Sequence, residues 1–197
     1  MKIRIFFIII LLIMCQSAFS RPNIDYKRWD KNKAVIDDVF KNNLPKKFIV
    51  KKETVWIETV SSSEFIDMFK CTNPVGTKLI INWGSYIEKG YFNPDYFQHN
   101  AQIYISEDVP ANQIKFVLCH EYAHHIYAVL INDKEKKKWL NIWKYEKEFN
   151  KFPRKYSGFS PEEGFADNFS FYCLDKTIIC DKSRLYFTRL EQSIKND

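Results

Sequence analysis

The stretch IKFVLCHEYAHHIYAVL at residues 114–130 determines the expected architecture. It places His120 and His124 four positions apart within a long apolar run. Residues four apart lie on one face of an α-helix, so both imidazoles can reach a single ion. The flanking residues predict an amphipathic, core-packed helix that ends near Leu130, and its apolar positions are Ile114, Val117, Leu118, Ile126 and Val129.

Glu121 follows His120 directly, one step round the predicted helix. From there its carboxylate can take a proton from a zinc-bound water without binding the metal itself. The competing interpretation is a buried helix that simply contains two histidines. Buried ring nitrogens need a partner that offsets their lost hydration, and a metal ion supplies one. We therefore expect Zn²⁺ as a cofactor. His125 lies off the ligand face and is expected to support a ligand or to lie at the surface.

A catalytic zinc site usually has three protein ligands and one open position. No histidine follows residue 130, and the chain lacks the His-x-x-Gly-x-x-His continuation of three-histidine sites. The third ligand is therefore expected to be acidic. The segment SPEEGFAD at 160–167 is the candidate, and it is predicted to open a helix with Ser160 as cap and Pro161 in its first turn.

Together, HEYAH at 120–124 and EGFAD at 163–167 resemble the gluzincin pattern, in which a helical glutamate completes the site. The 39-residue separation of His124 and Glu163, with Tyr156 seven positions before Glu163, is similar to that in the family of anthrax lethal factor and the Pro-Pro endopeptidases. The resemblance covers residues 114–172.

The resemblance implies a role for each matching residue. Glu163 would be the third zinc ligand, Tyr156 would donate its phenol to the oxyanion, and Asp167 would orient a ligand histidine. The chain departs from the family at Ala123, where relatives usually have glycine, and at Asp167, where they often have glutamate. Neither change removes a group that the chemistry needs.

Ser160 and Glu163 also fit a capping box, in which the Glu163 carboxylate turns back to the backbone N–H of Ser160. Ligation would point that carboxylate away from the cap. Asp167 lies one helical turn beyond Glu163, where it can support a ligand histidine, whereas Glu162 projects about 100° away round the helix. We therefore expect Glu163 as the metal ligand.

Residues 1–20 have the features of a signal peptide: Lys2 and Arg4, an apolar run at 5–14, and the small residues Ala18 and Ser20. Ten apolar residues span about half of a bilayer core as a helix, so a stable membrane anchor is not expected. We expect a single metallopeptidase domain at 21–197, secreted to the exterior or the periplasm. A surface protein held by a lipid or an uncleaved signal helix is the rival interpretation.

Removing Lys2 and Arg4 leaves 28 basic and 24 acidic residues, a net charge of +4. The excess gathers at 133–155, where lysines alternate with aromatic residues. This pattern fits either a nucleic-acid surface or an amphipathic helix with Trp139 packed inward. No nucleic-acid motif accompanies it, so we expect a solvated face and no nucleic-acid partner.

Four cysteines remain after the predicted cleavage: Cys71, Cys119, Cys173 and Cys180. An even number in an exported chain permits two disulfides. Cys173 and Cys180 are expected to pair, because a short turn after a helix would bring them together.

Apolar patterning predicts an α+β fold. The resemblance implies a zincin-like version, with a small mixed sheet, an active-site helix and a helical C-terminal half. Asp108 is expected to cap the active-site helix, with Pro110 in its first turn. The strand at 101–106 is expected to form the rim of a cleft where an extended peptide adds as a strand. The remaining expectations are helices at 27–42 and after a start at 61–64, one or two strands within 48–60, a strand at 77–83, and a loop at 84–100.

The expected activity is that of a secreted, monomeric zinc endopeptidase with a protein or peptide substrate. Its catalytic residues would be Glu121 and Tyr156, and its metal ligands His120, His124 and Glu163. The alternative is a catalytically silent binding module or toxin subunit on the same scaffold. The intact Glu121 and Tyr156 favour the enzyme.

Overall fold

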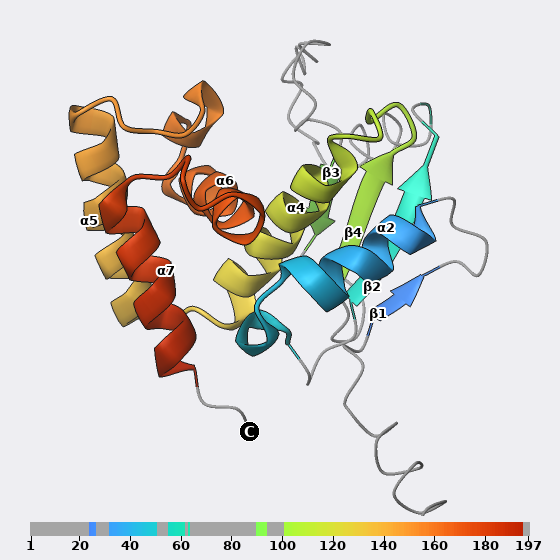
Figure 1. The fold of residues 1–197 in the computed structure, drawn as a ribbon, viewed down its shortest axis with the longest axis horizontal. Helices are drawn as coiled ribbons and strands as arrows, with labels where there is room; N and C mark the ends of the chain where they lie inside the picture. The colour runs from blue at the N-terminus through green and yellow to red at the C-terminus, as the bar shows by residue number, and fades with distance from the viewer. Residues whose placement is uncertain are drawn as a thin grey trace, which may run out of the picture.

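The computed structural model describes residues 24–26, 32–50, 55–61, 63, 90–93 and 101–194. This part of the chain is mostly helical and has a small sheet (Figure 1). The elements in chain order are β1 (Ile24–Tyr26), α2 (Lys33–Asp38), the π-helical η1 (Val39–Asn43), the 3₁₀ turn η2 (Lys46–Phe48), β2 (Val55–Val60), β3 (Gly90–Asn93), β4 (Ala101–Ser106), α4 (Ile114–Val129), α5 (Asp133–Glu148), the 3₁₀ turn η4 (Lys155–Gly158), α6 (Pro161–Leu174) and α7 (Asp181–Ser193).

The sheet has the strand order β1-β2-β4-β3. β1 and β4 both run parallel to β2, and β3 runs antiparallel to β4. The strand predicted at 101–106 is confirmed as β4, but the prediction that it forms a rim is wrong. β4 pairs on both sides, and β3 is the outer strand among those described. Ile57 and Ile103 are paired across β2 and β4 and are fully buried, which fixes the register of this pair.

One prediction for the N-terminal half needs correction. The loop predicted at 84–100 contains β3, a strand whose backbone is satisfied by β4. The prediction of one or two strands within 48–60 is confirmed by β2, and Phe48 closes the preceding 3₁₀ turn η2. The helix predicted at 27–42 is present from Lys33 and continues as η1, with Ile36 and Val39 buried.

α4 ends at Val129, close to the expected Leu130. It begins at Ile114 and not directly after Asp108, as the sequence had predicted. The backbone forms turns first, and Gln113 N donates to Pro110 O over 2.8 Å. Asp108 therefore does not cap α4. The helix is also not amphipathic, because it lies between the sheet and α6 and is buried on nearly every side (Figure 1).

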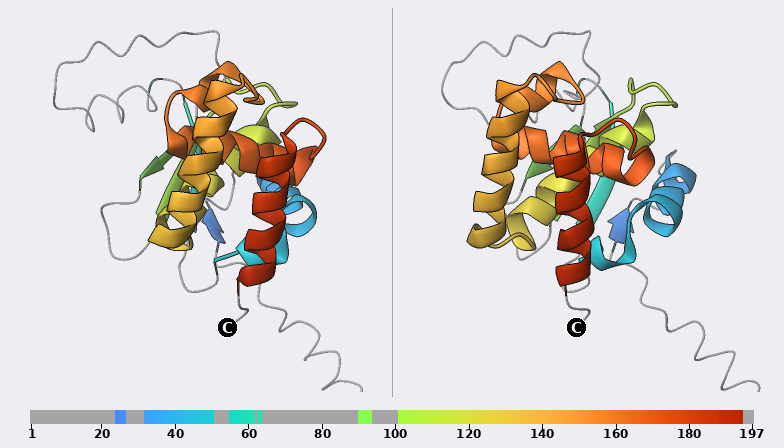
Figure 2. Two further views of the ribbon diagram at one scale, coloured as in Figure 1. Left: turned by 90° about the vertical axis from the view of Figure 1, so that its left-hand side faces the viewer. Right: turned by 60° about the vertical axis from the view of Figure 1, so that its left-hand side comes forward.

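The last three α-helices pack through an aromatic cluster. α5 and α7 lie side by side at one flank of the molecule, with α6 behind them (Figure 2). Phe165 of α6 lies 5.6 Å from Trp139 of α5 and 5.2 Å from Phe187 of α7, measured between ring centroids, and all three side chains are fully buried. The inward packing of Trp139 confirms the amphipathic interpretation of 133–155.

The predicted disulfide between Cys173 and Cys180 is wrong, because both thiols are free, as is Cys119. Cys173 lies in the last turn of α6, beside Cys119 of α4. Cys180 precedes α7, where its thiol donates to Glu146 Oε1 over 3.3 Å. Cys71 lies outside the described residues.

Several predictions concern parts of the chain that the structure does not describe: the signal peptide at 1–20, the helix beyond residue 64 and the strand at 77–83. Within the described part, no helix has the length and apolar character needed to span a membrane.

Candidate metal centre

α4 supplies two imidazoles to the centre. His120 is 1% exposed and His124 18% exposed. Their Nε2 atoms lie 3.2 Å apart, because residues four apart project from the same side of a helix. The expected convergence of the two rings is therefore present.

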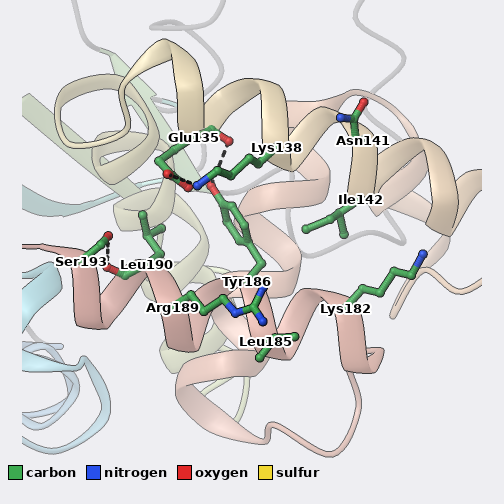
Figure 3. A pocket seen from close by; sticks show the side chains of 10 residues that line it. All are labelled: Glu135, Lys138, Asn141, Ile142, Lys182, Leu185, Tyr186, Arg189, Leu190 and Ser193. Carbon is green, nitrogen blue, oxygen red and sulfur yellow. Dashed lines mark hydrogen bonds and ion pairs between the residues drawn. The ribbon is translucent and has the colours of Figure 1, made fainter.

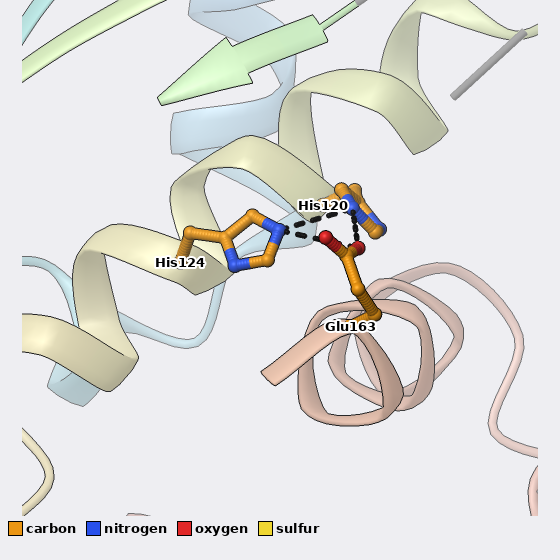
Figure 4. A group of neighbouring side chains, drawn as sticks. All are labelled: His120, His124 and Glu163. Carbon is orange, nitrogen blue, oxygen red and sulfur yellow. Dashed lines mark hydrogen bonds and ion pairs between the residues drawn. The ribbon is translucent and has the colours of Figure 1, made fainter. Parts of the chain in front are cut away.

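α6 supplies the carboxylate. Pro161 starts this helix, and the hydroxyl of Ser160 accepts a hydrogen bond from the backbone N–H of Glu163 over 3.2 Å. Only the backbone of Glu163 takes part in this cap. Its side chain points at the histidines, with Oε2 3.1 Å from His120 Nε2 and 3.5 Å from His124 Nε2 (Figure 4). Glu162 is exposed.

The glycine after Glu163 lets the start of α6 approach α5. A Cβ on Gly164 would lie 2.5 Å from the Trp143 ring and 2.9 Å from the carbonyl oxygen of Ser157. The same carbonyl accepts a hydrogen bond from Trp143 Nε1 over 2.9 Å. A glycine is thus required for η4 and α6 to pack at this distance.

His120, His124 and Glu163 form the group that could hold a metal ion among the described residues, with all candidate ligand atoms within 4.8 Å of one another. The three closest atoms form a triangle with sides of 3.1, 3.2 and 3.5 Å. Tetrahedral zinc with bonds of about 2.0–2.1 Å would separate its ligand atoms by about 3.3 Å. The donor set of two imidazoles and one carboxylate also suits zinc.

Asp167 holds the other side of the His120 ring. This carboxylate is fully buried, and its Oδ1 lies 3.0 Å from His120 Nδ1. A carboxylate accepts hydrogen bonds, so this contact favours a proton on Nδ1 and leaves Nε2 for the centre of the group. Ser157 Oγ donates to Asp167 Oδ2 over 2.7 Å, and Arg154 Nη1 lies 3.7 Å from Oδ1.

The buried carboxylates create a site for positive charge. Burial alone would lower the pKa of His120, but hydrogen bonds to Asp167 and Glu163 outweigh it and raise this pKa to about 10. Burial also acts to raise the pKa of Glu163, yet hydrogen bonds from His120 and His124 hold it well below its usual value. A cation between these residues is therefore electrostatically favoured.

Glu121 lies inside the same environment and is 3% exposed. Burial raises the pKa of its carboxyl to about 7, although His120 and His124 act to lower it. A carboxyl that titrates near neutrality is suited to proton transfer.

Tyr156 approaches the group from η4. Its ring centroid lies 6.2 Å from that of His120, and its ring stacks on the highly exposed Phe159 at 6.1 Å. Burial raises the pKa of the Tyr156 phenol, and the neighbouring Glu163 carboxylate adds to the effect. The hydroxyl therefore stays protonated and can donate a hydrogen bond.

Some of the surroundings were not expected. Ser157 and Arg154 both reach Asp167, although no spacing rule marks either residue in the sequence. His125 is completely buried against Tyr122, so the surface position considered for it is wrong. Burial lowers the pKa of His125 to about 4.

No protein-family model matches this chain, and no curated protein or solved structure is significantly similar to it. The centre is thus defined by its own geometry as a possible metal-binding site of two histidines and a glutamate.

Proposed function

We propose that this chain is a secreted zinc endopeptidase in which His120, His124 and Glu163 bind the metal. The triangle of ligand atoms carries the proposal, because its sides are close to the separation that tetrahedral zinc imposes. A buried carboxylate and a phenol lie beside the same group, so the site offers more than metal storage.

Zinc bound to this group would supply Lewis acidity, polarising a peptide carbonyl and favouring a nucleophilic water near neutral pH. The chain itself has to orient the ligands. His120 is held between Asp167 and Glu163, and Ser157 fixes Asp167 from the far side. This support reduces the freedom of the His120 ring before metal or substrate arrives.

Glu121 would act as the general base. It takes a proton from the attacking water and returns it to the nitrogen of the leaving amine. Burial places its pKa near 7, so the carboxyl can both accept and release a proton around neutral pH. As the residue after His120, it reaches the centre from the helix that carries two of the ligands.

Tyr156 would donate its hydroxyl hydrogen to the oxyanion that develops on the substrate carbonyl. Its raised pKa keeps that hydrogen in place at neutral pH. One such donor contributes about 3 kcal/mol to transition-state stabilisation in comparable sites.

The wider proposal is a zincin-like domain at 21–197 that follows a cleaved signal peptide at 1–20 and acts as a monomer. The order of elements supports it, since a small mixed sheet precedes the ligand-bearing helices α4 and α6. An extended peptide would add by backbone hydrogen bonds to β3, the outer strand among those described, and not to β4, which pairs on both sides.

Cleavage of a combinatorial peptide library tests this function. The zinc-loaded protein should release new amino termini, and mass spectrometry would read the sequence around each cut. Glu121→Gln is the matched control, since it has nearly the same shape and keeps the ligands. No cleavage by the zinc-loaded protein, or equal cleavage by both proteins, would exclude the proposed enzyme.

A further inference from the structure

A pocket opens between α5 and α7 (Figure 3), on the flank formed by the C-terminal helices (Figure 2). Its volume is about 510 Å³. None of its lining residues belongs to the His120, His124 and Glu163 group, so any role for it is independent of the proposed peptidase activity. We call this surface the α5–α7 groove.

The floor of the groove is apolar and firmly supported. Leu185 of α7 is 48% exposed there, and Ile142 of α5 lines the same pocket (Figure 3). The ring of Tyr186 packs on the buried Trp139 at 5.4 Å, and its hydroxyl donates to the backbone oxygen of Glu135 over 3.3 Å. The floor is therefore pre-formed and can receive apolar side chains.

The walls of the groove are cationic. α7 places Lys182 and Arg189 on either side of Leu185 and Tyr186, seven residues apart. Seven residues correspond to two helical turns, or about 10 Å along the axis. Arg189 has no ion-pair partner within the described part of the chain, and Lys182 lies over the ring of Tyr145 at 3.5 Å.

The acidic residue of the groove is already neutralised. Glu135 accepts a hydrogen bond from Lys138 over 2.6 Å, which leaves the two α7 cations uncompensated. A ligand that matches the surface must offer apolar groups to the floor and a negative charge to each of the two α7 cations.

We propose that the α5–α7 groove binds an acidic amphipathic helix of a protein partner. Two acidic residues seven positions apart would face Lys182 and Arg189, and the apolar residues between them would enter the floor at Leu185. The groove lies between two helices, so a third helix can lie along both of them. A single carboxylate on an alkyl chain would satisfy one cation only.

The probe is a dye-labelled synthetic helix of about 16 residues, with two glutamates seven positions apart that flank two leucines. One comparison peptide has lysines in place of the glutamates, and another has alanines in place of the leucines. Fluorescence anisotropy with the full chain measures each affinity. Sodium decanoate serves as the single-carboxylate ligand, and its binding is measured by calorimetry.

The groove variant is Lys182→Glu with Arg189→Glu. Its control is Lys137→Glu with Lys144→Glu, because these exposed α5 residues lie outside the groove and change the net charge equally. We expect the groove variant to lose at least about tenfold in affinity for the glutamate peptide and the control to change less than about twofold. The groove variant should instead gain affinity for the lysine peptide.

Equal losses in both variants would show non-specific attraction and overturn the proposal. Equal binding of the alanine peptide would also overturn it, because the apolar floor would then have no role. Decanoate binding that depends on Arg189, without peptide binding, would assign the groove to a small amphipathic anion instead. Far-UV circular dichroism and thermal unfolding check that both variants remain folded.

Discussion

His120 Nδ1 lies 3.0 Å from Asp167 Oδ1, across the contact between α4 and α6. The two residues are 47 positions apart in the chain, and both side chains are buried. The ring that offers Nε2 to the centre is thus oriented by the same helix that supplies Glu163. Any change in the packing of α6 on α4 would therefore alter both the orientation of the His120 ring and the position of the Glu163 carboxylate.

Asp167→Asn should weaken zinc binding by about 10–100-fold and leave the fold intact. The amide keeps the size of the side chain but removes the charge that holds the His120 Nδ1 proton. Competition against a chromophoric chelator measures the change. Glu162→Gln, an exposed charge removal on the same helix, should bind zinc as the wild type does. Equal affinities for wild type and Asp167→Asn would contradict the role given to this contact.

Glu121→Gln should lower kcat by about 10²–10⁴ and retain zinc, because the amide cannot accept a proton and the ligands are unchanged. Peptide hydrolysis and metal analysis on the same preparation separate the two effects. Residual turnover above about a tenth of the wild-type rate would exclude Glu121 as the base.

Tyr156→Phe should lower kcat by about 10²–10³ with little change in zinc content, as expected for the loss of one oxyanion donor. The phenylalanine ring keeps the stack on Phe159, so the variant tests the hydroxyl alone. Tyr145→Phe is the matched control on the surface of α5, and it should leave kcat unchanged. An unaltered rate in Tyr156→Phe would mean that the residue only packs in its loop.

Glu146 allows a test of the buried network away from the metal. Burial raises the pKa of its carboxyl, although Ser183, Cys180 and Asn168 donate hydrogen bonds to it that act to lower the pKa. In the folded protein the pKa of Glu146 is therefore above its unfolded value of about 4.5. The stability that the neutral carboxyl contributes is fully present below about pH 4.5, and it is lost as the pH rises through the folded-state pKa.

Between about pH 5 and pH 8, the wild type should therefore lose unfolding free energy relative to Glu146→Gln, which carries no charge at this position. Urea unfolding of both proteins at the two pH values measures the difference. The prediction is wrong if the difference in unfolding free energy stays constant with pH, or if the wild type becomes relatively more stable at the higher pH. Either result would show that the folded protein accommodates the ionised Glu146 carboxylate without a penalty.

Local signals in the sequence predicted much of the metal centre. The i, i+4 spacing of His120 and His124 requires only a helix, and Ser160 with Pro161 marks the start of α6. Likewise, the end of α4 and the strand β4 follow from short-range patterns. Such features depend on a few neighbouring residues, and tertiary packing did not override them.

The features that were mispredicted depend on distant partners. β3 exists because β4 satisfies its backbone, and four residues are too few to show an alternating pattern. Cys180 is near Cys173 in sequence, yet its thiol bonds to Glu146 of α5. Arg154 and Ser157 belong to the centre only through their contacts with Asp167, which a spacing rule cannot reveal.

The most direct test of the metal centre is the zinc content of two neighbouring variants after dialysis against a mild chelator. Glu163→Ala removes a proposed ligand but keeps the backbone N–H that donates a hydrogen bond to the Ser160 hydroxyl at the helix cap. Glu162→Ala removes an exposed carboxylate one position earlier. We predict that Glu163→Ala loses most of its zinc and that Glu162→Ala keeps about one ion per chain, like the wild type. Equal zinc in the two variants, or loss in Glu162→Ala alone, would contradict the assignment of His120, His124 and Glu163 as the zinc site.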